Sequence, residues 1–203
     1  YVYLNDVSSD VTFLGRSDSG QSFDLFVQYR PSLSNDLRVN TGTSYSPHTF
    51  SWTPSTSTWY HVSITRSGSD LKAFIDGSQI GSTASDSNNI SLNRSVGIGY
   101  NINNTGQFLD GYMADVRLIN GTAITPPSGG PSKRLTAVSN TALLVCHLPN
   151  LKDGSTNNHT ITLVDNPEIR PFAPYDNDEY STTDHGGSVY LDGTGDSLTW
   201  TNN

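Results

Sequence analysis

The sequence predicts an all-β fold, an antiparallel sandwich of short strands joined by tight turns. Only 15% of the 203 residues are charged, and the acidic ones are 17 Asp against 2 Glu. Glu and Lys favour helices, whereas Asp, Asn, Ser, Thr and Gly favour turns and caps. With 18 Gly and 10 Pro in addition, the composition excludes helix as a major element.

Short runs of alternating apolar and polar residues support this fold class, because a half-buried strand shows a period of two. In residues 23–29, for example, Phe23, Leu25, Val27 and Tyr29 fall on one face. Asp76-Gly77 is the dipeptide favoured in two-residue hairpin turns, and it predicts a hairpin of residues 71–75 with 78–82. Over the first part of the chain we expect strands at residues 23–29, 58–66, 71–75, 78–82, 95–100 and 111–119.

The composition changes between residues 123 and 133, where proline and glycine become frequent. The residues concerned are Pro126, Pro127, Gly129, Gly130 and Pro131, which mark the best boundary in the chain. Beyond it, residues 142–148 and 160–164 are expected to form one hairpin. Residues 188–191 and 196–200 are expected to form another.

Charge and hydropathy exclude two classes of partner. The net charge is −8 and the pI is near 4.8, and the basic residues are scattered. Binding to nucleic acid needs clustered Lys and Arg, so we expect no nucleic-acid partner. No run of about 20 apolar residues is present, so we expect no membrane insertion. The lone Cys146 fits a buried strand residue better than a nucleophile.

Four segments in order carry a resemblance to a known family. The chain resembles a laminin-G-like domain of the concanavalin A-like lectin/glucanase superfamily, which implies a jelly-roll sandwich. The matching segments are Trp59-Tyr60-His61-Val62, Phe74-Ile75-Asp76-Gly77, Val96-Gly97-Ile98-Gly99 and Phe108-Leu109-Asp110-Gly111-Tyr112-Met113-Ala114-Asp115-Val116-Arg117.

The second half of the chain resembles the opening strands of the same family, in residues 143–161 and 186–198. We therefore expect residues 1–125 to be the later strands of one sandwich, 126–141 a Pro/Gly-rich linker, and 142–203 the opening strands of another. Three arrangements produce this order. In the first, which we favour, the chain is a segment of a tandem array of such domains. In the second, it is a circularly permuted domain, and in the third, it exchanges strands with neighbouring copies.

The sequence pattern of residues 143–175 is similar to that of repeated structural proteins of marine bacteriophages. This resemblance implies a module of a virion fibre, tail fibre or decoration protein, located in the virion or at the cell surface. We expect such a module to act in assembly with neighbouring copies or repeats of the same fold, in glycan-mediated adhesion, or in both.

The alternative, from another functional class, is a carbohydrate-active enzyme or the carbohydrate-binding module of such an enzyme. Glycosidases need two carboxylates about 5–9 Å apart, and glucanases of this fold place glutamates in a short strand motif. Glu168 and Glu179 lie in the connecting segment, outside such a motif. We therefore expect no enzymatic activity.

Two loops have the contents of a glycan site, since aromatic rings stack on sugars and amides bind hydroxyl groups. The candidate residues are Tyr45, His48, Tyr100, Asn101, Asn103 and Asn104. Trp59 is interpreted as a core or strand-edge aromatic residue. The Asp- and Asn-rich loops could supply oxygen ligands to Ca²⁺, although the Asp-Gly pairs at Asp76, Asp110, Asp153 and Asp192 are explained more simply as turns.

Overall fold

A computed structural model describes residues 1–17, 23–42, 44–90, 95–101, 106–175 and 187–200. Within these ranges nearly all regular structure is strand, and the only helix is one 3-10 turn, η1 (Pro31–Leu33). All strand pairs described are antiparallel, which confirms the predicted all-β sandwich. No helix in the described ranges is long and apolar enough to cross a membrane.

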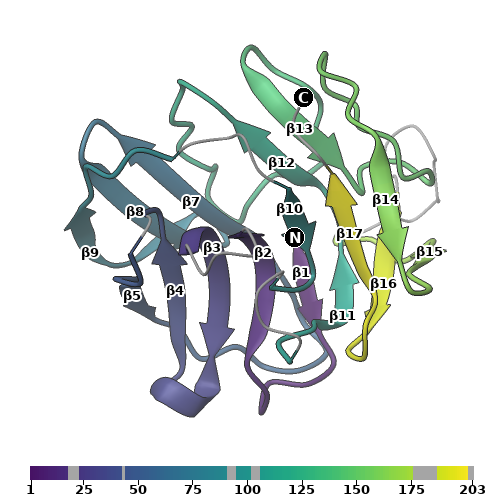
Figure 1. Cartoon of the computed structure of the whole chain (residues 1–203), viewed down its shortest axis with the longest axis horizontal. Coiled ribbons are helices and arrows are strands. Elements are labelled where there is room, and N and C mark those ends of the chain that lie inside the picture. The colour runs from purple at the N-terminus through teal and green to yellow at the C-terminus, as the bar shows by residue number, and fades with distance from the viewer. Residues whose placement is uncertain (18–22, 43, 91–94, 102–105, 176–186, 201–203) are drawn as a thin grey trace.

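Two large sheets form the sandwich (Figure 1). Among the described strands, one sheet has the order β14 (Ile161–Val164), β17 (Ser197–Trp200), β10 (Val96–Ile98), β2 (Val11–Ser17), β3 (Phe23–Arg30), β4 (Asp36–Asn40) and β5 (His48–Ser51). The other has the order β15 (Glu168–Arg170), β16 (Ser188–Asp192), β11 (Asp110–Met113), β1 (Val2–Leu4) and β6 (Trp59–Tyr60). We call them the seven-stranded and the five-stranded sheet.

Two smaller sheets extend the sandwich. One has the order β7 (Val62–Ser67), β8 (Asp70–Ile75) and β9 (Ser78–Ser85), and the other pairs β12 (Val116–Ile119) with β13 (Thr141–Val145). The hairpin predicted at Asp76-Gly77 is confirmed, since Ile75 pairs with Ser78. Asp76 and Gly77 have φ values of +49° and +76°, as a two-residue turn of this kind requires.

The strands expected at 58–66 and 111–119 are each divided between two sheets. The first divides at His61, between β6 and β7, and the second at Ala114 and Asp115, between β11 and β12. Asp115 has a φ of +52°, and its N–H bonds to Cys146 O at 2.9 Å instead of continuing the ladder of β11. A left-handed residue turns the chain, so the alternation of side chains does not run through it.

Both hairpins expected in the second half are wrong. β13 pairs with β12, whereas β14 pairs with β17. β16 lies in the five-stranded sheet, and β17 lies in the seven-stranded sheet. The loop at Asp192-Gly193-Thr194-Gly195 therefore crosses from one sheet to the other. Period-two alternation shows only that a strand has one buried face, and both sheets bury a face in the same core.

Residues from both halves of the chain form one hydrophobic core. Its members include Val2 and Leu4 of β1, Leu143 and Val145 of β13, and Leu191 of β16. In Figure 1 the yellow strands β16 and β17 lie beside β11 and β10, and the register pairs Tyr112 with Tyr190 and Ile98 with Leu198. Residues 126–141 contain no strand. The domain boundaries at 125 and 142 remain predictions.

Candidate functional site

The structure brings the two candidate loops to neighbouring positions on the outer face of the seven-stranded sheet. Leu25 and Val27 of β3 pack against the core, so Phe26 between them points outward. Tyr45, in the loop between β4 and β5, stacks on Phe26 with ring centroids 5.9 Å apart. Gly15 of β2 pairs with Phe26, and a Cβ on Gly15 would lie 2.8 Å from Tyr100 O.

Of the residues predicted in the loop after β10, Asn101 is turned inward. Its side chain is 5% exposed, and Nδ2 lies 3.5 Å from Gln107 Oε1. Gln107 Oε1 also accepts a hydrogen bond of 2.9 Å from Gln28 Nε2 on β3. Asn101 thus helps to fasten the loop to the sheet. Asn103 and Asn104 lie outside the described residues.

Tyr100 and Tyr45 differ in how far their rings are open to solvent. Tyr100 lies parallel to Phe108, with centroids 6.0 Å apart and 5° between the planes, and burial raises its pKa. The side chain of Tyr45 is 49% exposed although Phe26 holds one side of its ring. Tyr45 is therefore the member of the predicted set that presents an aromatic ring to solvent.

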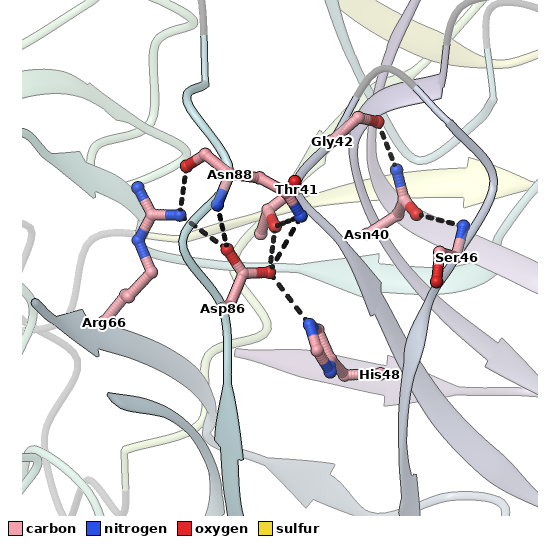
Figure 2. A network of polar contacts seen from close by, with 8 residues as sticks. All are labelled: Asn40, Thr41, Gly42, Ser46, His48, Arg66, Asp86 and Asn88. Carbon is pink, nitrogen blue, oxygen red and sulfur yellow. Dashed lines mark hydrogen bonds and ion pairs between the residues drawn. The ribbon is translucent and has the colours of Figure 1, made fainter. Parts of the chain in front are cut away.

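A buried carboxylate anchors the loop that carries Tyr45 (Figure 2). Asp86 follows β9 and is 2% exposed. Its Oδ1 accepts hydrogen bonds from Arg66 Nη1 at 2.7 Å and from Asn88 N at 3.0 Å. Its Oδ2 accepts one from the Thr41 hydroxyl and lies 2.8 Å from His48 Nε2. We call these five residues the Asp86 network.

The Asp86 network ties β7, the end of β9 and both ends of the β4–β5 loop together. Burial raises the pKa of Asp86, but the hydrogen bonds from Thr41, Arg66 and His48 outweigh burial and lower the pKa to about 2. The carboxylate is therefore ionised at neutral pH and attracts Arg66. His48 faces Asp86, so its place in the predicted set is that of an anchor for the loop.

Asn40 holds the same loop from within. Its Nδ2 donates to Gly42 O at 2.7 Å, and its Oδ1 accepts from Ser46 N at 3.0 Å. Thr41 and His48 on either side are bound to Asp86. The backbone that presents Tyr45 is thus fixed by hydrogen bonds at both ends, which lowers the entropy lost when a ligand binds.

Sequence reasoning missed Phe26 and Asp86. Phe26 had a usable signal, because the alternation in residues 23–29 leaves one large aromatic residue on the polar face. Asp86 had no such signal, because the Ser, Asn and Asp residues around it give a sequence typical of any solvent-exposed loop.

Two of the aspartates explained as turn residues, Asp153 and Asp192, accept hydrogen bonds from the backbone around them. Asp153 accepts backbone hydrogen bonds from Leu144, Ser155 and His159 at 3.0, 2.8 and 3.0 Å. Asp192 accepts one from Thr194 N at 2.8 Å. Among the described residues no group of three or more His, Cys, Asp or Glu side chains is placed to hold a metal ion.

Comparison with known proteins identifies the family. A model of the family described as the concanavalin A-like lectin/glucanases superfamily matches residues 1–127. The chain belongs to this superfamily. The match spans β1 to β12, so Phe26, Tyr45 and the Asp86 network lie inside it, and β13 to β17 lie beyond it. No curated protein and no solved structure matches the chain.

Membership in the concanavalin A-like superfamily agrees with the resemblance found in the sequence and with the sandwich. Domains of this family are often carbohydrate-binding.

Proposed function

We propose that this chain is a non-catalytic glycan-binding module of a repeated surface or virion fibre protein, and that Tyr45 is the platform on which the sugar stacks. The observation that carries the proposal is an exposed aromatic ring on a rigid base: Tyr45 is 49% exposed and lies against Phe26. An aromatic ring that is already ordered offers stacking area at little entropic cost.

The family supports a carbohydrate as the ligand. Polar groups that could orient a sugar lie on the same face of the sheet as Phe26, which is two residues from Gln28 on β3. Arg38 of β4 pairs with Gln28 on one side and with Thr49 of β5 on the other. Thr49 is exposed and Arg38 is partly exposed. A few polar groups beside an aromatic platform are what fixes the orientation of a bound sugar.

The environment of the carboxylates supports a module without catalysis. Asp86 and Asp153 have their oxygens occupied by protein donors. Burial raises the pKa of Asp115 to about 6, as in some general acids, but this side chain is 5% exposed and accepts a hydrogen bond from Tyr175. Glu168 forms an ion pair with Arg170 on β15.

The assignment to a fibre rests on the resemblance of residues 143–175 to repeated structural proteins of marine bacteriophages. In such a protein, many copies of one module each bind weakly, and together they hold a glycan-covered surface through avidity.

A glycan array tests the proposal. We expect the wild-type chain to bind a subset of glycans and Tyr45→Ala to weaken that binding about tenfold, which corresponds to losing a stacked ring. Tyr45→Phe should retain most of the binding, because it keeps the ring.

Leu33→Ala is the matched control, because Leu33 is a large apolar side chain that is 40% exposed on η1. It should bind like the wild type. If the folded wild-type chain bound no glycan, assembly would be left as the function. If Tyr45→Ala bound normally, the sugar site would lie elsewhere.

A further inference from the structure

A cavity of about 630 Å³ lies at the outer face of the five-stranded sheet. It is formed where the start of β1, the strand β6 and the β8–β9 turn meet the segments 128–132 and 174–175. Its volume is in the range of small-molecule sites. It lies on the opposite sheet from Tyr45, and it shares no residue with the glycan site proposed above.

Three of the residues that line the cavity are aromatic: Tyr1, Trp59 and Tyr175. The rings of Tyr1 and Tyr175 have centroids 5.5 Å apart and planes at 76°, which is an edge-to-face contact. Trp59 packs against Tyr3 and Phe172, with centroid distances of 5.5 and 5.2 Å. The positions of these aromatic side chains are thus set by neighbouring rings.

One carboxylate shares the cavity with these rings. Asp76 lines the cavity, and its Oδ1 accepts a hydrogen bond of 2.7 Å from His61 N, which fixes the side chain. Its Oδ2 makes no hydrogen bond with the part of the chain that the structure describes. Trp59 Nε1 has no partner among the same residues, but it is buried and does not open into the cavity. The cavity thus offers one free acceptor.

Positive charge is scarce around the cavity. Its described lining contains no Lys, Arg or His. Burial lowers the pKa of His61, behind Tyr1, to about 4, so this imidazole is neutral at pH 7. The backbone nitrogen of Tyr1 donates to Ala114 O at 2.7 Å within the sheet.

Aromatic rings that line a cavity together with a carboxylate are suited to an organic cation, because each ring face attracts positive charge. We propose that this cavity binds a quaternary ammonium group, as in choline. The ammonium group lies against Tyr1, Trp59 and Tyr175 and faces Asp76. An anion is disfavoured, because Asp76 would repel it.

Choline titrated into the wild-type chain, followed by tryptophan fluorescence and calorimetry, tests this inference. The reference ligand is the uncharged isostere of choline, in which carbon replaces the quaternary nitrogen. Since the two have the same shape and the same hydroxyl group, we expect choline to bind about tenfold more tightly through its charge alone. Equal affinities, or no saturable binding of choline, would overturn the proposal.

Asp76→Asn is the decisive variant, because it removes the charge and keeps an oxygen to accept from His61 N. It should weaken choline binding about tenfold and leave the isostere unaffected. Asp70→Asn, at the exposed start of β8, is the matched control and should bind like the wild type. Loss of choline binding in the control as well would contradict the assignment to Asp76.

Two further binding measurements define the ligand. Vesicles of phosphatidylcholine compared with free choline distinguish a lipid headgroup from a soluble cation, and binding of either supports the proposal. Saturation by a neutral oligosaccharide in place of choline would overturn it. Tyr45→Ala should leave choline binding unchanged, so failure here and failure of the glycan proposal are separate outcomes.

Discussion

At the scale of single residues, Asp86 shows how one buried charge organises a loop. Asp86→Asn should lower the free energy of unfolding by about 2 kcal/mol at pH 7, because the neutral amide binds Arg66 and His48 more weakly. The pKa of Asp86 is about 2 in the folded chain and 3.8 without interactions. Its contribution is therefore complete above about pH 5 and is lost as the pH falls through 2. Urea unfolding of both proteins across this range should show the difference shrinking, whereas the exposed Asp70→Asn should match the wild type throughout. A difference that keeps its full size at pH 2 would contradict this account.

At the scale of elements, the β8–β9 turn is fastened to the Pro/Gly-rich connector. Gly129 N donates to Asp76 O at 2.8 Å, and a Cβ on Gly77 would lie 1.9 Å from Pro127 O. Gly77→Ala should therefore destabilise the fold through both its positive φ and a backbone clash. Gly68→Ala is the matched control, since Gly68 has a φ of +60° and nothing within 4 Å of its added Cβ. We expect a loss of about 1 kcal/mol at Gly68 and at least about 2 kcal/mol more at Gly77, measured by urea unfolding. Equal losses would show that the connector does not confine the turn.

At the scale of the whole molecule, the two halves of the chain complete one core. β16 lies between β15 and β11, and β17 lies between β14 and β10. We therefore expect residues 1–203 to unfold in one cooperative transition as a monomer, checked by calorimetry and light scattering. A variant ending at residue 140 lacks β13 to β17 and should lose that transition, because Leu143, Leu191 and Leu198 leave the core with those strands. Cooperative unfolding of the truncated chain, or a wild-type chain that folds only as a dimer, would favour a tandem array or strand exchange.

The sequence predicted the fold class and the Asp76-Gly77 hairpin because both depend on local chemistry, namely turn residues and period-two alternation. It did not predict which strands pair. Val189 and Leu198 both belong to the buried core, yet they lie in different sheets. In the candidate site, the sequence placed Tyr45 on a polar loop, where the structure has it. It left out Asp86, because a carboxylate that binds Thr41, Arg66 and His48 from distant strands carries no local pattern.

The position of β16 and β17 has a consequence for synthesis. Both strands emerge from the ribosome long after the neighbours β10 and β11 with which they pair. Until then, β10 and β11 each have an unpaired edge and exposed apolar side chains. Nascent chains in this condition aggregate or exchange strands. In a polysome, several nascent copies lie close together. There β16 or β17 of one chain can pair with the unpaired edge of β11 or β10 of another. We therefore expect the yield of monomer to depend on the rate of translation and on the supply of chaperones that shield open sheet edges.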